Sequence, residues 1–462
     1  HLCLADHETG VPAPASRRTR CRARMTRVFP AHTYGEGPRA RGYWQTTAEM
    51  PDFPRAEGDI NCDVAVIGAG FTGLSAALHL AEAGQDVRVF EAKTPAWGAS
   101  GRNGGFCCLG GSAASDAMLR KMHGEAARRE YRQSEAEAVR FTRALIDANG
   151  IVSDIHSDGE TVLAHTPKAA AGFAERAARI KADYGVTPTL IPGSELTQMG
   201  MKGPFYATPL GVALNPFKYT LGLAQAASQA GARIYAHSPV EGISQTSGFT
   251  LTTPHARFTA RRLIVATNGY SSDDLPEWMR ARYIPTQSNV IVTRPLTEDE
   301  LAAQGWTTRQ MCYDDRFFLH YFRLMTDNRM LFGMRGGLFS SPGFDARMHR
   351  TIRRHFEAMF PAWAHVETPH SWNGLLSLAP DLTPYAGPIP DMPGAFTGLS
   401  YHGNGVAMAS YAGGILADLA MDRAPRTLYP EIMRKPPRKW PLGRFRRAML
   451  WPPYALATLT GG

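Results

Sequence analysis

The spacing of apolar and polar residues changes several times along the chain, and each change marks a different kind of element. A short apolar run over 63–67 leads through three glycines into a segment of helical spacing that ends at Gly84, and a second apolar run follows over 86–90. This order predicts a buried strand, a tight turn, a helix and a second strand, as at the start of a parallel sheet.

Later segments repeat both kinds of spacing. Long amphipathic stretches predict helices over 125–149 and 216–230, and the second of these leads into a strand over 233–240. Shorter runs predict further strands over 161–165, 290–293, 317–323 and 330–334, with a hairpin turn over 326–329.

The first strand, turn and helix carry a dinucleotide-binding pattern. Gly68 permits the tight turn, Gly70 lets the backbone approach a pyrophosphate, and Gly73 lets the helix pack closely. The helix start offers free N–H groups to the phosphates. Glu91 ends the second strand, where a carboxylate can accept from ribose hydroxyls. An acidic residue there disfavours NADP, whereas the motif alone fits both NAD and FAD.

Three further segments favour FAD. A glycine-rich loop over 97–106 suits backbone that passes close to a long, flat ligand. An apolar strand over 262–265 ends in the small-residue turn 266–269, which resembles the second conserved turn of FAD-dependent oxidoreductases. The segment 394–421 predicts a strand, a turn and a helix that begins near Gly405, whose positive end could face the flavin N1–C2=O edge.

In this order the segments resemble the D-amino-acid oxidase/glycine oxidase/sarcosine oxidase superfamily, and within it the γ-glutamylputrescine oxidase-type enzymes. The resemblance spans roughly residues 35–425 and also rests on 214–240, 317–337 and 371–389. It implies an α/β fold in which a Rossmann-type FAD-binding domain is interleaved with an α+β substrate domain on a mostly antiparallel sheet. The implied division is an N-terminal extension over 1–59, an FAD-binding domain over 60–151, 212–275 and 371–430, a substrate domain over 152–211 and 276–370, and a basic tail over 431–462.

The resemblance also implies which residues hold FAD, including Val240, whose backbone position meets the adenine ring in relatives. The full set lies in the fingerprint, the glycine-rich loop and the later turns: Gly68, Ala69, Gly70, Phe71, Thr72, Gly73, Glu91, Ala92, Ser100, Gly101, Arg102, Asn103, Gly104, Gly105, Val240, Ala266, Thr267, Asn268, Gly269, Gly403, Asn404, Gly405, Val406 and Ala407.

Two departures from the family pattern bear on substrate and linkage. The arginine that binds the substrate carboxylate in α-amino-acid oxidases is matched here by Leu376. Either the substrate lacks an α-carboxylate, or another arginine, Arg323 or Arg335, binds that carboxylate. The flavin-linking cysteine of monomeric sarcosine oxidase is matched by Gly374, and histidine-linked relatives carry their histidine where this chain has 102–103. We therefore expect noncovalent FAD.

The implied reaction oxidises the C–N bond of an amine: a polyamine, a γ-glutamyl-polyamine or an N-substituted amino acid. Hydride passes to flavin N5, the imine hydrolyses, and oxygen reoxidises the cofactor to give hydrogen peroxide. The alternatives are a D-amino-acid-type dehydrogenase that uses a quinone and a non-catalytic FAD-binding subunit. Alternation along 317–323 leaves open which of its faces meets the ligand. The candidates for the pocket are His402, Tyr321, His320, Trp372, Tyr401 and Arg323.

Charge and cysteine content add little to this picture. The formal charge of +9 is concentrated in the tails, since residues 25–422 carry a net −2, so we expect no nucleic-acid partner. The six cysteines form no CxxC pair and no zinc-spaced cluster, which predicts no metal site and a cytoplasmic setting. The basic tail could touch an anionic membrane surface, although packing on its own domain is the commoner role. We expect the natural start at Met25 and a non-native or disordered segment over 1–24.

Overall fold

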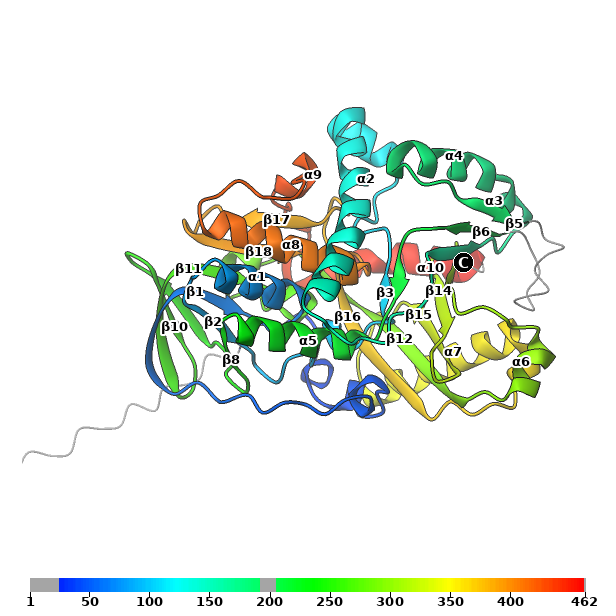
Figure 1. Cartoon of the computed structure of the whole chain (residues 1–462), viewed down its shortest axis with the longest axis horizontal. Helices are drawn as coiled ribbons and strands as arrows, with labels where there is room; N and C mark the ends of the chain where they lie inside the picture. The colour runs from blue at the N-terminus through cyan, green and yellow to red at the C-terminus, as the bar shows by residue number, and fades with distance from the viewer. Residues whose placement is uncertain (1–24, 192–204, 461–462) are drawn as a thin grey trace, which may run out of the picture.

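Two β-sheets organise the computed structural model, which describes residues 25–191 and 205–460 (Figure 1). The expectation for residues 1–24 lies outside this range. Each sheet has its own covering helices and its own apolar core.

The first sheet is mainly parallel and holds the strands around the glycine-rich turn. Its central strand β1 (Gly58–Ile67) pairs in parallel with β2 (Val87–Phe90) and β11 (Ala256–Val265). The remaining strands are β8 (Arg233–Tyr235) beside β2, β18 (Ala395–Leu399) beside β11, β17 (Tyr385–Pro388) at the edge, and the hairpin β9 (Gly242–Gln245) and β10 (Phe249–Thr252), which joins β11.

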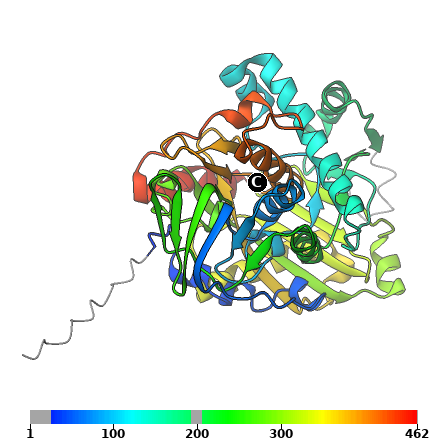
Figure 2. The same ribbon diagram turned by 60° about the vertical axis from the view of Figure 1, so that its left-hand side comes forward.

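Helices α1 (Phe71–Glu82), α5 (Pro216–Gln229) and α8 (Gly405–Ala420) lie side by side against this sheet (Figure 2). Their small residues allow close contact: a Cβ added at Gly413 of α8 would stand 2.5 Å from the Thr72 carbonyl oxygen of α1. Packing without large side chains therefore brings the start of α1 against the middle of α8.

Helix α2 (Asp116–Ala148) crosses both halves of the molecule (Figure 1). It begins nine residues before the predicted start at 125, because Ser115 caps the Met118 N–H and starts a segment of about two turns before Gly124. Gly124, with φ of 85°, kinks the helix and hides the continuity from the sequence pattern.

The second sheet is mostly antiparallel, with one parallel pair between β13 (Met311–Asp314) and β4 (Glu160–Leu163). Its full order is β16 (His370–Leu378), β12 (Ile284–Pro295), β15 (Arg329–Arg335), β14 (His320–Leu324), β13, β4, β6 (Phe205–Thr208) and β5 (Thr189–Ile191). The covering helices are α3 (Pro167–Ala171), α4 (Phe173–Tyr184), α6 (Glu298–Gln304) and α7 (Pro342–Met359). A parallel sheet and a mostly antiparallel sheet built from interleaved segments confirm the predicted fold class.

Strand β16 differs from the division expected from the sequence. The range 371–430 was expected in the FAD-binding domain, yet β16 pairs along its whole length with β12 of the second sheet. The chain returns to the first sheet only at β17. Strand β16 thereby brings Gly374–Ser377 to the boundary between the sheets. A minor ladder of β3 (Phe106–Cys107) and β7 (Val212–Ala213) lies at the same boundary.

The basic tail packs on the protein through α9 (Glu431–Arg434), a 3₁₀ segment (Gly443–Leu450) and α10 (Trp451–Thr460). Arg446 is fully buried and forms a bidentate pair with Asp273 at 2.6 and 2.8 Å. Part of the tail's charge is therefore used for internal structure. Within the described residues, no helix combines the length and the apolar character needed to cross a bilayer.

Candidate active site

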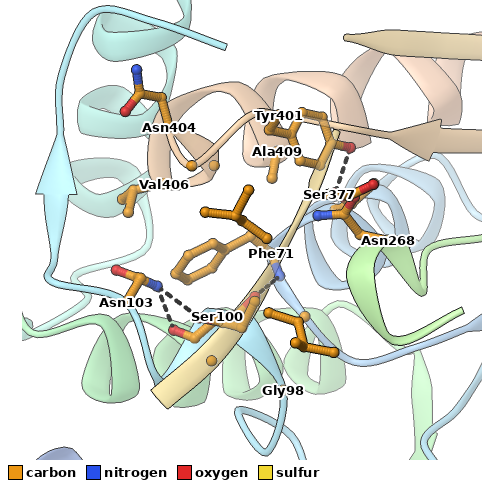
Figure 3. Close-up of a pocket in the computed structure, with 18 of the residues that line it drawn as sticks. Phe71, Gly98, Ser100, Asn103, Asn268, Ser377, Tyr401, Asn404, Val406 and Ala409 are labelled. Carbon is orange, nitrogen blue, oxygen red and sulfur yellow. Dashed lines mark hydrogen bonds between the residues drawn. The ribbon is translucent and has the colours of Figure 1, made fainter. Parts of the chain in front are cut away.

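A cavity of about 570 Å³ runs from the turn after β1 to the boundary between the two sheets (Figure 3). Figure 3 shows Phe71, Ser100, Tyr401 and Asn404 around it, from three separate segments of the chain. Its size lies within the range of cofactor and substrate sites.

The turn between β1 and α1 forms one end of the cavity. Gly68 has φ of 105°, and a Cβ there would stand 2.7 Å from the Ala266 carbonyl oxygen, so a side chain is excluded on two grounds. Glu91 accepts hydrogen bonds from the N–H groups of Ala69 and Lys93, both at 2.9 Å. Burial nevertheless raises the pKa of Glu91.

The loop over 97–105 forms the second wall. Ser100 Oγ accepts from the Phe71 N–H at 3.0 Å and caps the start of α1, whose N-cap residue Gly70 has no side chain to do so. The Asn103 amide donates to the carbonyls of Ala99 and Ser100, each at 3.0 Å. These contacts fix the loop before any ligand enters.

Two turns from the carboxyl ends of β11 and β18 close the cavity. Asn268 Oδ1 accepts from the Ser400 N–H at 2.9 Å, and the hydroxyls of Ser400 and Ser377 lie 2.9 Å apart. The N-terminus of α8, at Gly405, opens on the same space. Parallel strands thus bring segments from distant parts of the sequence to one edge.

Most of the residues predicted to hold FAD line this cavity. They are Gly68, Ala69, Gly70, Phe71, Thr72, Glu91, Ala92, Ser100, Arg102, Asn103, Gly104, Val240, Ala266, Thr267, Asn268, Gly403, Asn404, Gly405 and Val406. Five predicted residues pack behind the wall instead: Gly73, Gly101, Gly105, Gly269 and Ala407. A Cβ at Gly73 or Gly101 would stand about 2.0 or 1.9 Å from a backbone oxygen, so these glycines serve close packing of the chain on itself.

The candidates on strand β14 divide between its two faces. Tyr321 lines the cavity, and its hydroxyl lies 2.8 Å from Ser288 Oγ. His320 points to the opposite side, where Nδ1 lies 2.6 Å from Asp314 Oδ2 and Nε2 lies 2.8 Å from His355. The structure therefore puts the Tyr321 face toward the cavity and keeps His320 in the core of the second sheet.

Arg323 lies on the same face of β14 as Tyr321, but its guanidinium hydrogen-bonds to the protein backbone. It is 1% exposed, and its guanidinium donates to the carbonyls of Gly104 and Leu214 at 3.0 and 2.7 Å. Its third contact is His156 Nε2 at 2.9 Å, and burial lowers the pKa of Arg323. Arg323 therefore holds the glycine-rich loop and does not reach the cavity wall.

Trp372 has a similar supporting position. Its indole N–H donates to the Arg102 carbonyl at 2.7 Å, and Trp44 donates to the Asn103 carbonyl at 2.8 Å. The two indoles pack edge to face. Trp372 lies behind the loop rather than on the cavity wall.

His402, the polar candidate at the second turn, is buried and uses both ring nitrogens. The Ala379 N–H donates to Nε2 at 3.1 Å, and Nδ1 lies 2.9 Å from the Gly111 carbonyl, to which it donates. Burial lowers the pKa of His402 to about 4, so the ring is neutral at pH 7. Its neighbour Tyr401 does line the cavity, with its hydroxyl 2.8 Å from Thr72 Oγ1.

Arg335, named from the sequence only as an alternative grip for a carboxylate, reaches the cavity at the α8 turn. Its guanidinium donates to Asn404 Oδ1 at 3.2 Å and would contact a Cβ at Gly403. No carboxylate among the described residues forms a salt bridge with it, and burial lowers its pKa. Leu376, at the family's carboxylate-binding position, also lines the cavity.

Sequence patterns contain no signal for the charged and phenolic residues at the far end of the cavity. They lie on α2, α4 and the second sheet: Asp116, Arg132, Glu135, Glu160, Arg176, Arg179, Asp183, Tyr184, Tyr206 and Tyr313. We call this set the polar chamber. Its members share no spacing in the sequence, and only burial of Glu160 among apolar strand residues could have been noticed.

Comparison with known proteins agrees with this geometry. Residues 63–419 match the family model described as DAO, FAD dependent oxidoreductase. The γ-glutamylputrescine oxidoreductase of Escherichia coli is 30% identical over 389 residues, which cover 83% of this chain and 89% of that protein. A probable oxidoreductase OrdL of Rhizobium meliloti is 30% identical over 416 residues, which cover 88% and 94%. The glycine oxidase structure from Geobacillus kaustophilus superposes with a TM-score of 0.67 at 20% identity, over 81% of this chain and 99% of that chain.

This chain belongs to the DAO family of FAD-dependent oxidoreductases. It is an enzyme that acts on amines or amino acids.

The residues of this DAO-family enzyme fit FAD. The Glu91 carboxylate, the start of α1 and the backbone turn at Gly68 form one end of a continuous cavity, and the start of α8 lies further along it. A Cβ at Gly70 would stand 2.8 Å from Ser100 Oγ and fill the space over the helix start. Gly374, which offers no thiol, also lines the cavity.

Cys107 and Cys108 follow the loop directly and are both buried. Burial raises the pKa of the Cys107 thiol to about 12 and that of Cys108 well above its usual value. Both are therefore thiols at pH 7, as expected for small buried side chains and not for nucleophiles.

Proposed function

We propose that this enzyme oxidises the C–N bond of an amine, drawn from polyamines, γ-glutamyl-polyamines and N-substituted amino acids, with noncovalent FAD and with oxygen as electron acceptor. The observation that carries the proposal is the continuity of the cavity from the Gly68 turn to Tyr321 and Arg335. A ligand bound along the fingerprint would meet a second ligand between the two sheets. The similarity to γ-glutamylputrescine oxidoreductase supports an amine in the second position.

The chemistry that FAD supplies when bound is removal of a hydride, which carries two electrons and one proton, from the carbon beside the amine nitrogen, while the nitrogen loses a second proton. The substrate becomes an imine, which water hydrolyses to a carbonyl compound and an amine, and oxygen takes up the two electrons to give hydrogen peroxide. The amine must enter neutral, because its lone pair forms the new C=N bond.

Arg335 favours the neutral amine. A guanidinium without a carboxylate partner raises the local positive potential and disfavours an ammonium group nearby. Tyr321 and Tyr401 contribute ring surface that excludes water from the same space. His402 acts through position, since its two hydrogen bonds fix the turn between β18 and α8.

Leu376 argues against a free α-amino acid held in the usual way, because its side chain cannot pair with a carboxylate. With Arg323 committed to backbone carbonyls, Arg335 is the arginine on this hairpin that could hold an acidic group next to the amine. Noncovalent attachment is supported by Gly374 and by Arg102 and Asn103, which offer no thiol or imidazole.

The test is anaerobic titration of the yellow holoenzyme with single amines, followed by admission of air. Bleaching of the flavin absorbance by an amine, rapid return of colour and one peroxide per turnover are expected. Bleaching with slow return in air, but fast return with a quinone, would replace the oxidase with a dehydrogenase. Absence of bleaching with every amine and amino acid would leave a non-catalytic FAD-binding protein.

A further inference from the structure

The polar chamber contains one carboxyl group, that of Glu160, and one guanidinium, that of Arg176, which lie close together but form no salt bridge with each other. Glu160 on β4 is 2% exposed, and Arg176 lies on α4. The Arg176 guanidinium donates to the Tyr313 hydroxyl at 3.3 Å, and that hydroxyl donates to Glu160 Oε1, also at 3.3 Å. A phenol group therefore separates a carboxyl group from a guanidinium in the same cavity wall.

Both charged groups keep unused hydrogen-bonding capacity. Glu160 Oε2 is buried without a hydrogen-bond partner, and so is the hydroxyl of Tyr206, which is 0% exposed and also lines the cavity. Arg176 stacks its guanidinium over the Tyr206 ring at 5.1 Å and forms no salt bridge with a described carboxylate. Buried polar atoms such as Glu160 Oε2 and the Tyr206 hydroxyl are rarely left without a partner unless a ligand or water completes them.

Each of the other charged members of the chamber has a direct partner of opposite charge. Arg132 pairs with Glu135 at 2.8 Å and with Asp116 at 2.9 Å, and Tyr184 donates to Glu135 at 2.6 Å. These groups form a closed network on α2 and α4. Glu160 and Arg176 are thus distinguished from their neighbours by lacking a direct partner of opposite charge.

We propose that Glu160 and Arg176 bind the two ends of a zwitterion: the α-ammonium and α-carboxylate of an amino-acid head group. This inference rests on the proposed function and narrows its substrate class. An amine substrate whose far end carries such a head group, as in a γ-glutamyl amide of a diamine, extends from the α8 turn into the polar chamber. The ammonium completes Glu160 Oε2 and the carboxylate completes the guanidinium.

The zwitterion fits better than either charge alone. A ligand with only an ammonium would be attracted by Glu160 and repelled by Arg176, and a simple carboxylate would meet the reverse. A neutral tail would leave both groups as they are. The alternation of charge across Tyr313 therefore selects a ligand with both charges a few atoms apart.

The test uses three amine probes that differ only in the head group. γ-Glutamylputrescine has both charges, N-glutarylputrescine lacks the α-ammonium, and N-(4-aminobutanoyl)putrescine lacks the α-carboxylate. For the wild-type holoenzyme, kcat/KM should be roughly 10- to 100-fold higher for the first probe than for either of the others, mainly through KM. Equal values for the three probes overturn the inference, whatever any variant does.

Two isosteric or shortened variants assign the charges. Glu160→Gln should lose the preference for the α-ammonium and keep that for the α-carboxylate, whereas Arg176→Gln should do the opposite. Matched controls on α4 are Glu175→Gln and Lys181→Gln, both exposed, which should keep the full preference. An equal loss on all three probes would overturn the assignment.

Binding is measured separately with γ-glutamyl-n-butylamide, which has the head group but no oxidisable amine. It should perturb the flavin spectrum of the wild type and inhibit competitively, with affinity roughly 10-fold weaker in either variant. Arg176→Lys, with unchanged FAD content and thermal midpoint, covers the case in which Arg176→Gln folds poorly. If some other amine bleaches the flavin while the γ-glutamyl probes do not bind, the inference fails and the proposed function stands. If no amine bleaches it, the proposed function fails.

Discussion

The two ends of the cavity are lined by different chemical groups. At the Gly68 turn the chain contributes mostly backbone: N–H groups, small residues and close passes that exclude a Cβ. In the polar chamber it contributes long charged and phenolic side chains from α2, α4 and the second sheet. The backbone end suits a cofactor whose shape does not vary, and the side-chain end suits a substrate that varies between relatives.

This difference explains why the cofactor could be predicted from the sequence and the substrate could not. A backbone approach demands glycine at fixed spacing, so 68, 70 and 73 form a pattern that any reader can find. A charge in the chamber can come from any strand or helix that points inward. Adding a side chain at a glycine of the backbone end should therefore affect cofactor binding, and removing a charge from the polar chamber should affect the substrate, with little overlap between the two effects.

The largest effect is expected at the backbone end. Gly70→Val would push a side chain against Ser100 Oγ, 2.8 Å from the new Cβ, and break the cap on the Phe71 N–H. FAD affinity should fall by roughly 1000-fold, about 4 kcal/mol, as measured by flavin content and by titration of apoprotein with FAD. Gly343→Ala, with nothing within 4 Å of the new Cβ, should retain full flavin. Stoichiometric FAD in Gly70→Val would contradict the backbone interpretation.

The second effect concerns the boundary between the two ends, where Arg323 ties strand β14 to the glycine-rich loop. Arg323→Met leaves the carbonyls of Gly104 and Leu214 without their donor, so the free energy of unfolding should fall by about 3 kcal/mol. The measurement is a denaturant titration of the holoenzyme. KM for the amine should change little, because Arg323 does not line the cavity. A variant with normal stability and a raised KM would move Arg323 into the substrate site.

Sequence patterns identified the fold class, the fingerprint and the turns, because these depend on local backbone demands that glycine and apolar spacing reveal. They did not separate Arg323 from Arg335, although both lie on the same hairpin and were named together. The two arginines differ in their tertiary contacts. Arg323 is surrounded by backbone carbonyls, whereas Arg335 faces the open cavity. His402 was chosen for its place beside the turn, and only the structure shows that backbone groups occupy both its nitrogens.

The third effect tests the side-chain end through pH. Burial raises the pKa of Glu160 from 4.5 to about 7, with Arg176, Tyr313 and Cys108 facing it and Glu135 further away. The Glu160 carboxyl in the folded protein therefore binds its proton more tightly than the same group in the unfolded chain. Proton binding at Glu160 contributes fully to the stability of the fold below about pH 4.5, and this contribution is lost as the pH rises to about 7.

Glu160→Gln removes this dependence. The variant should gain stability over the wild type by about 3 kcal/mol at pH 8 and by about 1 kcal/mol at pH 5, as measured by thermal unfolding without substrate. Glu175→Gln, on the exposed side of α4, should show no such difference between the two pH values. A parallel pH dependence in wild type and Glu160→Gln would show that Glu160 has an ordinary pKa.

The smallest effect is expected for Arg335, which stands between the two ends and acts on the amine through its field. In Arg335→Gln the ammonium form of the bound substrate is no longer disfavoured, so the acidic limb of the kcat profile, which reports ionisations in the enzyme–substrate complex, should move up by about 1 pH unit, equivalent to about 1.4 kcal/mol. Peroxide formation between pH 6 and 10 measures this, and Arg347→Gln on the exposed face of α7 is the control for a general change in charge. If Arg335 instead grips an acidic group beside the amine, KM rises at every pH and the limb stays in place. The shape of the profile therefore separates a field that acts on a proton from a contact that binds a carboxylate.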